Sequence, residues 1–247
     1  MNSIEINAKA VELRTRFGED ENSYVDVFSL ANQIPDLTLM LYPMGEYISG
    51  VCIKSEGANV IAINSLMSYG RQRYSLAHEL YHLFYDNSNG VTISSKSFGA
   101  DSENEKDADA FASFLLAPYN ALRALVQKKA STPLTMRDVV LFEQTFGMSH
   151  QAMLRRLLAD GFIDAGAAER MSGSVIHYAK QLGYDDRLYL PTPEEKQKTT
   201  YGNYILQAEE LKERGIISTG KYEELLLDAF RYDIVYGEEE SEGTIDD

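Results

Sequence analysis

Apolar residues recur along the chain with two different spacings, and each spacing predicts one kind of element. Short apolar runs that are rich in β-branched residues and bounded by turn residues predict strands. Apolar residues three and four positions apart predict helices, and this spacing dominates the rest of the sequence. The predicted strands lie in the first half of the chain, at 37–42, 47–53, 59–64 and 91–94.

Helices are predicted on both sides of these strands and throughout the second half of the chain. Prolines and glycines end most of them. The stretch Tyr189–Thr200, with two prolines among polar residues, is the expected linker. The expected helices are 5–18, 25–34, 71–85, 103–116, 119–129, 135–146, 149–160, 164–182, 202–214 and 219–232.

This order of elements predicts an α+β fold. A small twisted β-sheet would pack on the helices at 71–85 and 103–116, and a mostly helical C-terminal half would follow. We expect a first unit at 1–130 and a helical region at 131–237. Residues 238–247 are acidic and contain glycine and serine, so we expect them to form a disordered tail.

Composition and charge narrow the function classes. The formal net charge of −15 argues against a phosphate-binding surface, so direct nucleic-acid binding is not expected. A single cysteine, Cys52, excludes a disulfide within the chain and fits the reducing cytosol. We expect neither a signal peptide in the N-terminal residues nor a segment that spans a membrane, which makes the cytoplasm the predicted location.

The predicted helix at 71–85 carries the first candidate chemistry. It is apolar on most of its circumference, which predicts burial, yet it contains His78, Glu79 and His82. Spacing of four residues places both imidazoles on one face, where their nitrogens can converge on one ion. Glu79 projects beside that face and can accept a proton from a metal-bound water. The alternative is two core histidines bonded to backbone, with a coincidental glutamate.

A second polar cluster lies on the predicted helix at 103–116. A catalytic zinc site usually has three protein ligands, and this helix offers the third. Glu105 and Asp109 are four residues apart, on a face that adjoins the apolar stripe. Glu105 would ligate the metal, and Asp109 would hydrogen-bond the free ring nitrogen of a ligating histidine. The alternative is an acidic, solvated start of a helix, favoured by the helix dipole.

Two segments carry a family resemblance. Residues 73–82, RYSLAHELYH, and residues 105–118, ExxADxFAxxLLAP, resemble the ImmA/IrrE family of metallo-endopeptidases. The strand at 61–64 and the stretch at 224–237 fit the same family more loosely. The resemblance implies that 1–130 is a zinc metallopeptidase-like core.

The resemblance also assigns roles to residues. It implies zinc as the cofactor, His78, His82 and Glu105 as its ligands, and Glu79 as the general base. Many members cleave helix-turn-helix repressors and so relieve repression in mobile elements or stress responses, which implies such a repressor as the protein partner. Many members have glycine where this chain has Tyr81. A tyrosine there would narrow the site, lend its hydroxyl to the developing oxyanion, or pack in the core.

Several alternatives stay open from the sequence. The protein would act without catalysis if it were a zinc-binding regulator or a toxin–antitoxin component that works by protein–protein binding. Residues 146–157 have the look of a helix-turn-helix with two arginines, which would suit DNA binding. The other interpretation of that segment is an αα-hairpin beside the catalytic region. His150 and His177 are candidates for stabilising the oxyanion, although a lone helical histidine is more often structural.

Overall fold

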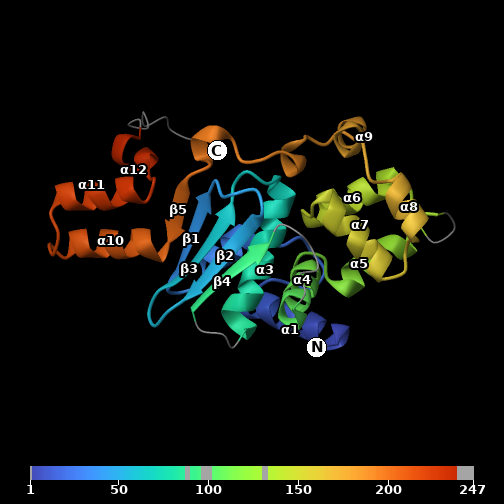
Figure 1. The fold of residues 1–247 in the computed structure, drawn as a ribbon, viewed down its shortest axis with the longest axis horizontal. Coiled ribbons are helices and arrows are strands. Elements are labelled where there is room, and N and C mark those ends of the chain that lie inside the picture. Colours follow the sequence, from blue (N-terminus) through green and yellow to red (C-terminus); the bar gives the residue numbers. More distant parts are fainter. Residues whose placement is uncertain (1, 87–89, 96–101, 130–132, 238–247) are drawn as a thin grey trace, which may run out of the picture.

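The computed structural model describes residues 2–86, 90–95, 102–129 and 133–237 (Figure 1). Among these residues one five-stranded sheet has the order β4-β2-β3-β1-β5. β1 and β3 run parallel, and the other neighbouring strands run antiparallel. The strands are β1 Leu37–Tyr42, β2 Ile48–Lys54, β3 Asn59–Asn64, β4 Gly90–Ser95 and β5 Thr199–Gly202.

Helices cover the sheet and extend to both sides of it. α3 packs on β2 and β3, α4 packs on α3, and α1 packs on α4. In Figure 1, α5 to α9 lie on one side of this stack, and α10 to α12 project on the other. None of the described helices combines the length and apolarity that a membrane span requires. The helices are α1 Ser3–Arg16, α2 Val27–Asn32, α3 Tyr69–Tyr85, α4 Glu103–Leu116, α5 Tyr119–Gln127, α6 Met136–Phe146, α7 His150–Ala159, α8 Ala165–Arg170, α9 Val175–Gln181, α10 Asn203–Glu213, α11 Thr219–Asp228 and α12 Tyr232–Tyr236.

The predicted α+β architecture is confirmed, with two corrections to its elements. The single helix expected at 164–182 is wrong, because the chain breaks between α8 and α9 at Ser174, whose φ of 63° no helix allows. The expected linker at 189–200 begins at the last residue of a short 3-10 helix, Arg187–Tyr189, contains a second one, Glu194–Lys196, and runs into β5. β5 pairs with β1, so the C-terminal half contributes a strand to the sheet.

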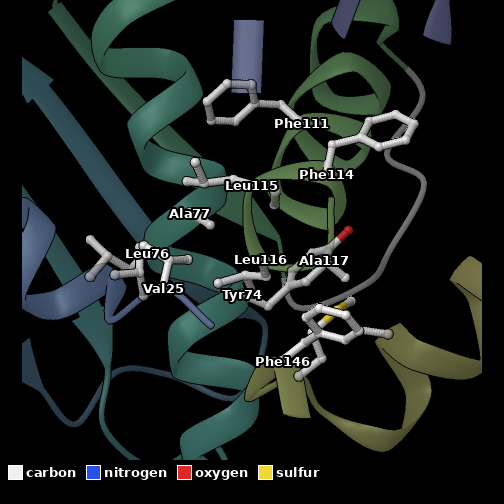
Figure 2. Close-up of a cluster of buried hydrophobic side chains, with 14 of the residues drawn as sticks. Val25, Tyr74, Leu76, Ala77, Phe111, Phe114, Leu115, Leu116, Ala117 and Phe146 are labelled. Atoms are coloured by element: carbon white, nitrogen blue, oxygen red, sulfur yellow. The ribbon is translucent and has the colours of Figure 1, made fainter. Parts of the chain in front are cut away.

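The α3–α4 seam forms the centre of the core (Figure 2). Leu76 and Ala77 of α3 and Phe111 and Leu115 of α4 have no exposed surface. The core continues into α6 and α7 through residues such as Val139, so the helical region shares it. The expected boundary at residue 130 stays a prediction, and the expected tail at 238–247 lies outside the described residues.

Two buried arginines anchor the ends of these elements. Arg14 of α1 donates from Nε to the carbonyl oxygen of Leu115 near the end of α4, over 2.8 Å. Arg73 of α3 donates to the carbonyl oxygens of Val25 and Gly147. Guanidinium groups suit this role because they satisfy several carbonyls at once while staying charged. α3 is thereby joined both to the segment before α2 and to the turn between α6 and α7.

Candidate metal centre

Three side chains from α3 and α4 converge where the two helices meet. Nε2 of His78 and Nε2 of His82 are 3.2 Å apart. Each of these nitrogens is also 3.2 Å from one carboxylate oxygen of Glu105. Together the three residues offer ligand atoms within 4.8 Å of one another, and they could hold a metal ion. Both histidines are buried, and the Glu105 side chain is 18 % exposed.

The position of Glu105 follows from how α4 begins. Ser102 is the N-cap of α4, and its hydroxyl accepts a hydrogen bond from the Glu105 backbone N–H. This cap fixes the first turn of the helix, so the side chain of its third residue projects from a defined backbone. Glu103 faces solvent and pairs with Lys106, whereas Glu105 turns toward the histidines.

Each imidazole has a carboxylate behind it. Nδ1 of His78 is 3.0 Å from Oδ1 of Asp109, and Nδ1 of His82 is 3.1 Å from Oδ2 of Asp86. A carboxylate on Nδ1 favours the tautomer with its proton there, which leaves the Nε2 lone pair for a metal. Asp109 thus contacts the His78 nitrogen that faces away from Glu105, and its role behind a metal ligand stays a prediction. The tyrosine hydroxyl of Tyr74 donates to the Asp109 carbonyl oxygen, over 2.7 Å.

Asp86 is a site residue that the sequence analysis missed. It is the C-cap of α3, four residues after His82, so the same helical spacing could have found it. Asn104 donates to the Asp86 carboxylate over 2.8 Å, which orients it. Lys54 of β2 donates to the carbonyl oxygens of His82 and Asp86, which have no partner within the helix at its end. The sheet thus supports the end of the metal-bearing helix.

Glu79 lies between α3 and the sheet. It has no exposed surface, and neither carboxylate oxygen accepts a hydrogen bond of normal geometry from a described residue, although the Ser94 hydroxyl of β4 lies near enough to interact with it. Gly50 of β2 makes the space for it, because a Cβ at Gly50 would lie 2.6 Å from Oε1 of Glu79. A buried carboxylate without normal hydrogen bonds is unfavourable unless a ligand or a water supplies them.

The charges around the cluster favour a cation. Hydrogen bonds from His78 and His82 lower the pKa of Glu105 to about 2. Burial lowers the pKa of His78, but its hydrogen bonds to Asp109 and Glu105 outweigh burial and raise the pKa to about 9. Burial raises the pKa of Glu79, and the charge on His78 opposes this. The acidic side chains around the two imidazoles create a negative electrostatic potential, which a divalent cation would neutralise.

The donor set fits a tetrahedral ion. Ligand atoms about 2.05 Å from a tetrahedral metal are roughly 3.3 Å apart, close to the 3.2 Å between the two histidine nitrogens. Two imidazoles and one carboxylate leave a fourth position free, the composition of a catalytic rather than a structural site. The buried oxygens of Glu79 lie next to this set.

Tyr81 is packed in the core beside the cluster, where its ring centroid is 5.9 Å from that of His82. Its side chain is 1 % exposed, its ring centroid is 5.7 Å from that of Phe111, and Nζ of Lys9 lies 5.5 Å from it. Burial, followed by the charge of Asp107, raises the pKa of the hydroxyl to about 12. Of the three roles considered for this tyrosine, the geometry favours packing against α1 and α4.

The turn between α6 and α7 is part of the core. Gly147 has φ 63°, and a Cβ there would lie 2.6 Å from Nε of Arg73, so only glycine fits without displacement. Of the two α7 arginines, Arg156 is buried and its Nε donates to Asp160 over 2.7 Å. The arrangement is that of an αα-hairpin packed against α3, the alternative to a DNA-reading helix.

The two remaining histidines lie outside the cluster. Nδ1 of His150 is 2.5 Å from Glu143, and its Nε2 is 2.6 Å from the carbonyl oxygen of Met171. His177 is exposed and is bonded to Gln181 of the same helix turn. Their partners give no support to a role for either histidine in stabilising an oxyanion at the metal centre.

The fold and the cluster together fit a metallopeptidase-like domain, in which one helix carries the pattern HExxH and the following helix carries a glutamate. Residues 36–158, from the start of β1 to the end of α7, match the family model Peptidase M78, described as the IrrE N-terminal-like domain. Over these residues the chain belongs to that peptidase family, which confirms the resemblance seen in the sequence. No curated protein shows significant similarity to the chain.

Proposed function

We propose that the protein is a zinc-dependent endopeptidase and that its substrate, a helix-turn-helix repressor, is recognised as an extended segment. The single observation that carries the peptidase proposal is the convergence of His78, His82 and Glu105 beside the buried carboxylate of Glu79. A structural metal site would need no such carboxylate, because its ligands close the coordination sphere.

The proposed roles follow from the contacts of each side chain. His78, His82 and Glu105 hold the zinc ion, and Asp109 and Asp86 hold the imidazoles from behind. A zinc ion held by these three residues would supply Lewis acidity toward a water and toward the carbonyl of the scissile peptide. Glu79 accepts the proton of the attacking water and returns it to the leaving amine. Its burial raises its pKa, which makes it a stronger base than an exposed glutamate.

Strand β4 is the proposed site for the substrate backbone. It is the last strand of the sheet on this side among the described residues. Its residue Ser94 pairs with Gly50, the residue of β2 that adjoins Glu79. An extended peptide that adds to this edge would form main-chain hydrogen bonds close to the catalytic carboxylate. Val91 and Ile93 are more than 60 % exposed, so the strand also offers apolar side chains to a partner.

The repressor as substrate rests on family resemblance, and the charge of the chain supports it. A protein with a net charge of −15 attracts basic partners, and helix-turn-helix proteins are basic where they contact DNA. The same charge opposes direct binding to DNA. Relief of repression by cleavage is therefore the proposed biological role, with regulation of transcription as its outcome.

Glu79→Gln tests the catalytic assignment. Zinc-loaded wild type is incubated with the helix-turn-helix proteins of its own proteome, and cleavage products are identified by mass spectrometry. Loss of a general base lowers the rate by about 100- to 10,000-fold. Zinc content is expected to stay at one ion per chain, because Glu79 is no ligand. Glu103→Gln is the matched control, since Glu103 is an exposed glutamate on α4, and its activity is expected to equal that of wild type.

Two outcomes would contradict the proposal. Undiminished cleavage by Glu79→Gln with zinc bound would remove Glu79 from the mechanism. Binding of a repressor without cleavage, at equal affinity in wild type and Glu79→Gln, would instead favour the zinc-binding regulator or a toxin–antitoxin component.

A further inference from the structure

A hollow separate from the metal ligands is lined by residues of α1, α4, α7 and the start of α5. Its volume is about 690 Å³. Apolar side chains form much of its wall, among them Ile4, Phe114, Tyr119 and Ala152. Hollows of about 300–1,000 Å³ with mostly apolar walls and a few polar groups are typical of small-molecule sites. Neither the family match nor the proposed peptidase chemistry assigns a role to this one.

Two polar atoms in residues of this wall lack partners among the described residues, Nη2 of Arg156 and Oδ1 of Asn7. Arg156 is 4 % exposed. Its Nε donates to Asp160, and its Nη1 donates to the carbonyl oxygen of Ser113. These bonds fix the guanidinium and leave one buried donor without an acceptor. Such a donor is unfavourable until a ligand or a water accepts from it.

The charged side chains that line the hollow determine whether a cationic or an anionic ligand is favoured. Arg155 and Arg156 both line the hollow. The carboxylates in the wall already have cationic or imidazole partners, because Asp160 is paired with Arg156 and Asp109 with His78. A local excess of arginine in a chain of net charge −15 favours an anionic group, which guanidinium binds through charge-assisted hydrogen bonds.

We propose that this hollow binds a small amphipathic anion. Its apolar body lies against Ile4, Phe114 and Tyr119, and its carboxylate lies at Arg155 and Arg156. One inserted amino-acid side chain would fill only part of the volume, and a neutral apolar ligand would leave the Arg156 donor unsatisfied. A ligand with an apolar body and one anionic head group would both fill the apolar volume and accept a hydrogen bond from Arg156.

The site adjoins the metal centre without including its ligands. Asp109 and Tyr74 belong to the wall, and Asp109 is also the partner of His78. Binding in the hollow needs neither zinc nor peptide hydrolysis. Ligand binding in the hollow can therefore be measured independently of the proposed peptidase activity.

Binding is tested on the full, zinc-free chain with two probes. Anilinonaphthalene sulfonate, an apolar anion, reports binding by fluorescence, and decanoate competes with it. We expect one site per chain and a Kd for decanoate of about 0.1 mM or tighter. Decanol, which has the same body without the charge, is expected to bind about tenfold more weakly because it lacks the charge-assisted hydrogen bond. Equal affinities for decanoate and decanol would overturn the anionic part of the proposal.

Two variants, each with one alanine replaced by phenylalanine, locate the site. Ala159 is exposed and lines the hollow at the end of α7, so Ala159→Phe fills it without burying a new group in the core. We expect at least a tenfold loss of decanoate affinity, because the phenylalanine ring takes up space in which the apolar chain of decanoate would otherwise be buried. Ala165→Phe, at an exposed position of α8 outside the hollow, is the matched control and is expected to bind as wild type does. Unchanged binding by Ala159→Phe, or equal losses in both variants, would overturn the site.

Arg155→Gln tests the head group by a separate route. Because Arg155 is exposed, its replacement is expected to leave the melting curve of the protein unchanged. Decanoate affinity is expected to fall about fivefold to tenfold, while decanol affinity changes less than twofold. A parallel loss for both probes would mean that Arg155 shapes the wall and does not bind the anion.

Discussion

Among the described residues, two clusters pair buried histidines with carboxylates, and they differ in what the second ring nitrogen of each histidine contacts. In the α3–α4 cluster, the Nδ1 atoms of His78 and His82 bind carboxylates and the Nε2 atoms face a shared carboxylate. In the α6–α7 cluster, His150 binds Glu143 through Nδ1 and the Met171 carbonyl oxygen through Nε2. The histidines of both clusters are buried, so burial and a carboxylate partner do not by themselves indicate a metal site.

The difference lies in which elements supply the partners. The α6–α7 cluster joins two helices and a turn, and Tyr189 adds a hydrogen bond from its hydroxyl to Glu143 over 2.9 Å. Every nitrogen of His150 is thereby used to hold the fold. In the α3–α4 cluster, each imidazole presents one nitrogen to the same small volume. A histidine is a ligand candidate when its second nitrogen points toward other ligand atoms.

The largest expected effect is the difference in zinc affinity between variants of the two clusters. His82→Ala removes a ligand, and about 10–16 kcal/mol of zinc affinity divided among three protein ligands corresponds to at least a hundredfold loss for one of them. His150→Ala is expected to bind zinc within twofold of wild type. Competition with a chromophoric chelator measures both. A large loss of zinc affinity in His150→Ala would show that the clusters are not separate in function.

Removal of zinc is expected to lower stability substantially. A ligand present at about a thousand times its Kd stabilises the folded state by roughly 4 kcal/mol. Urea denaturation of the zinc-loaded and chelator-treated protein measures the difference. The same comparison on His82→Ala is expected to show no difference. A stabilisation by zinc that survives in that variant would place the bound ion elsewhere.

His150→Ala is expected to destabilise the protein by about 3 kcal/mol, because it removes the imidazole that contacts the buried carboxylate of Glu143. The loss is expected in zinc-free protein as well, which distinguishes it from an effect on the metal centre. Urea denaturation in the presence of a chelator gives the value. His177→Ala, a change at an exposed histidine, is the control and is expected to lie within about 0.5 kcal/mol of wild type. A neutral His150→Ala would mean that this cluster contributes no net stability.

Asp86→Asn and Asp109→Asn compare the two carboxylates behind the ligands. Loss of such a partner typically lowers metal affinity by about 10- to 100-fold. Asp86 is also held by Asn104, so the structure predicts a loss at least as large for Asp86→Asn as for Asp109→Asn. Zinc titration measures both. No change in either variant would show that the backbone of α3 alone orients the imidazoles.

The sequence predicted those parts of the fold whose signals are local. α3 and α4 have long, regular apolar stripes, and the spacing of His78, His82, Glu105 and Asp109 within them already implied convergence. Asp86 is also four residues from a ligand candidate, His82. However, it lies at the end of α3, where the sequence does not show whether the helical spacing continues.

Non-local pairing accounts for the missed strand. β5 has four residues, and its partner β1 lies more than 150 residues earlier, so no pattern within either segment reveals the pair. The helix expected across 164–182 failed for a local reason, since Ser172, Gly173 and Ser174 mark a break that helical spacing on either side concealed.

The pairing of β1 with β5 also sets the order in which the chain can fold. During synthesis, at about 5–20 residues per second, β1 emerges roughly 8–30 s before β5. For that interval its outer edge has no strand to bond it, and an unpaired edge is a template for aggregation. Because pairs this distant in sequence form late, a chain that stops before β5 is expected to aggregate although it contains every residue of the metal centre.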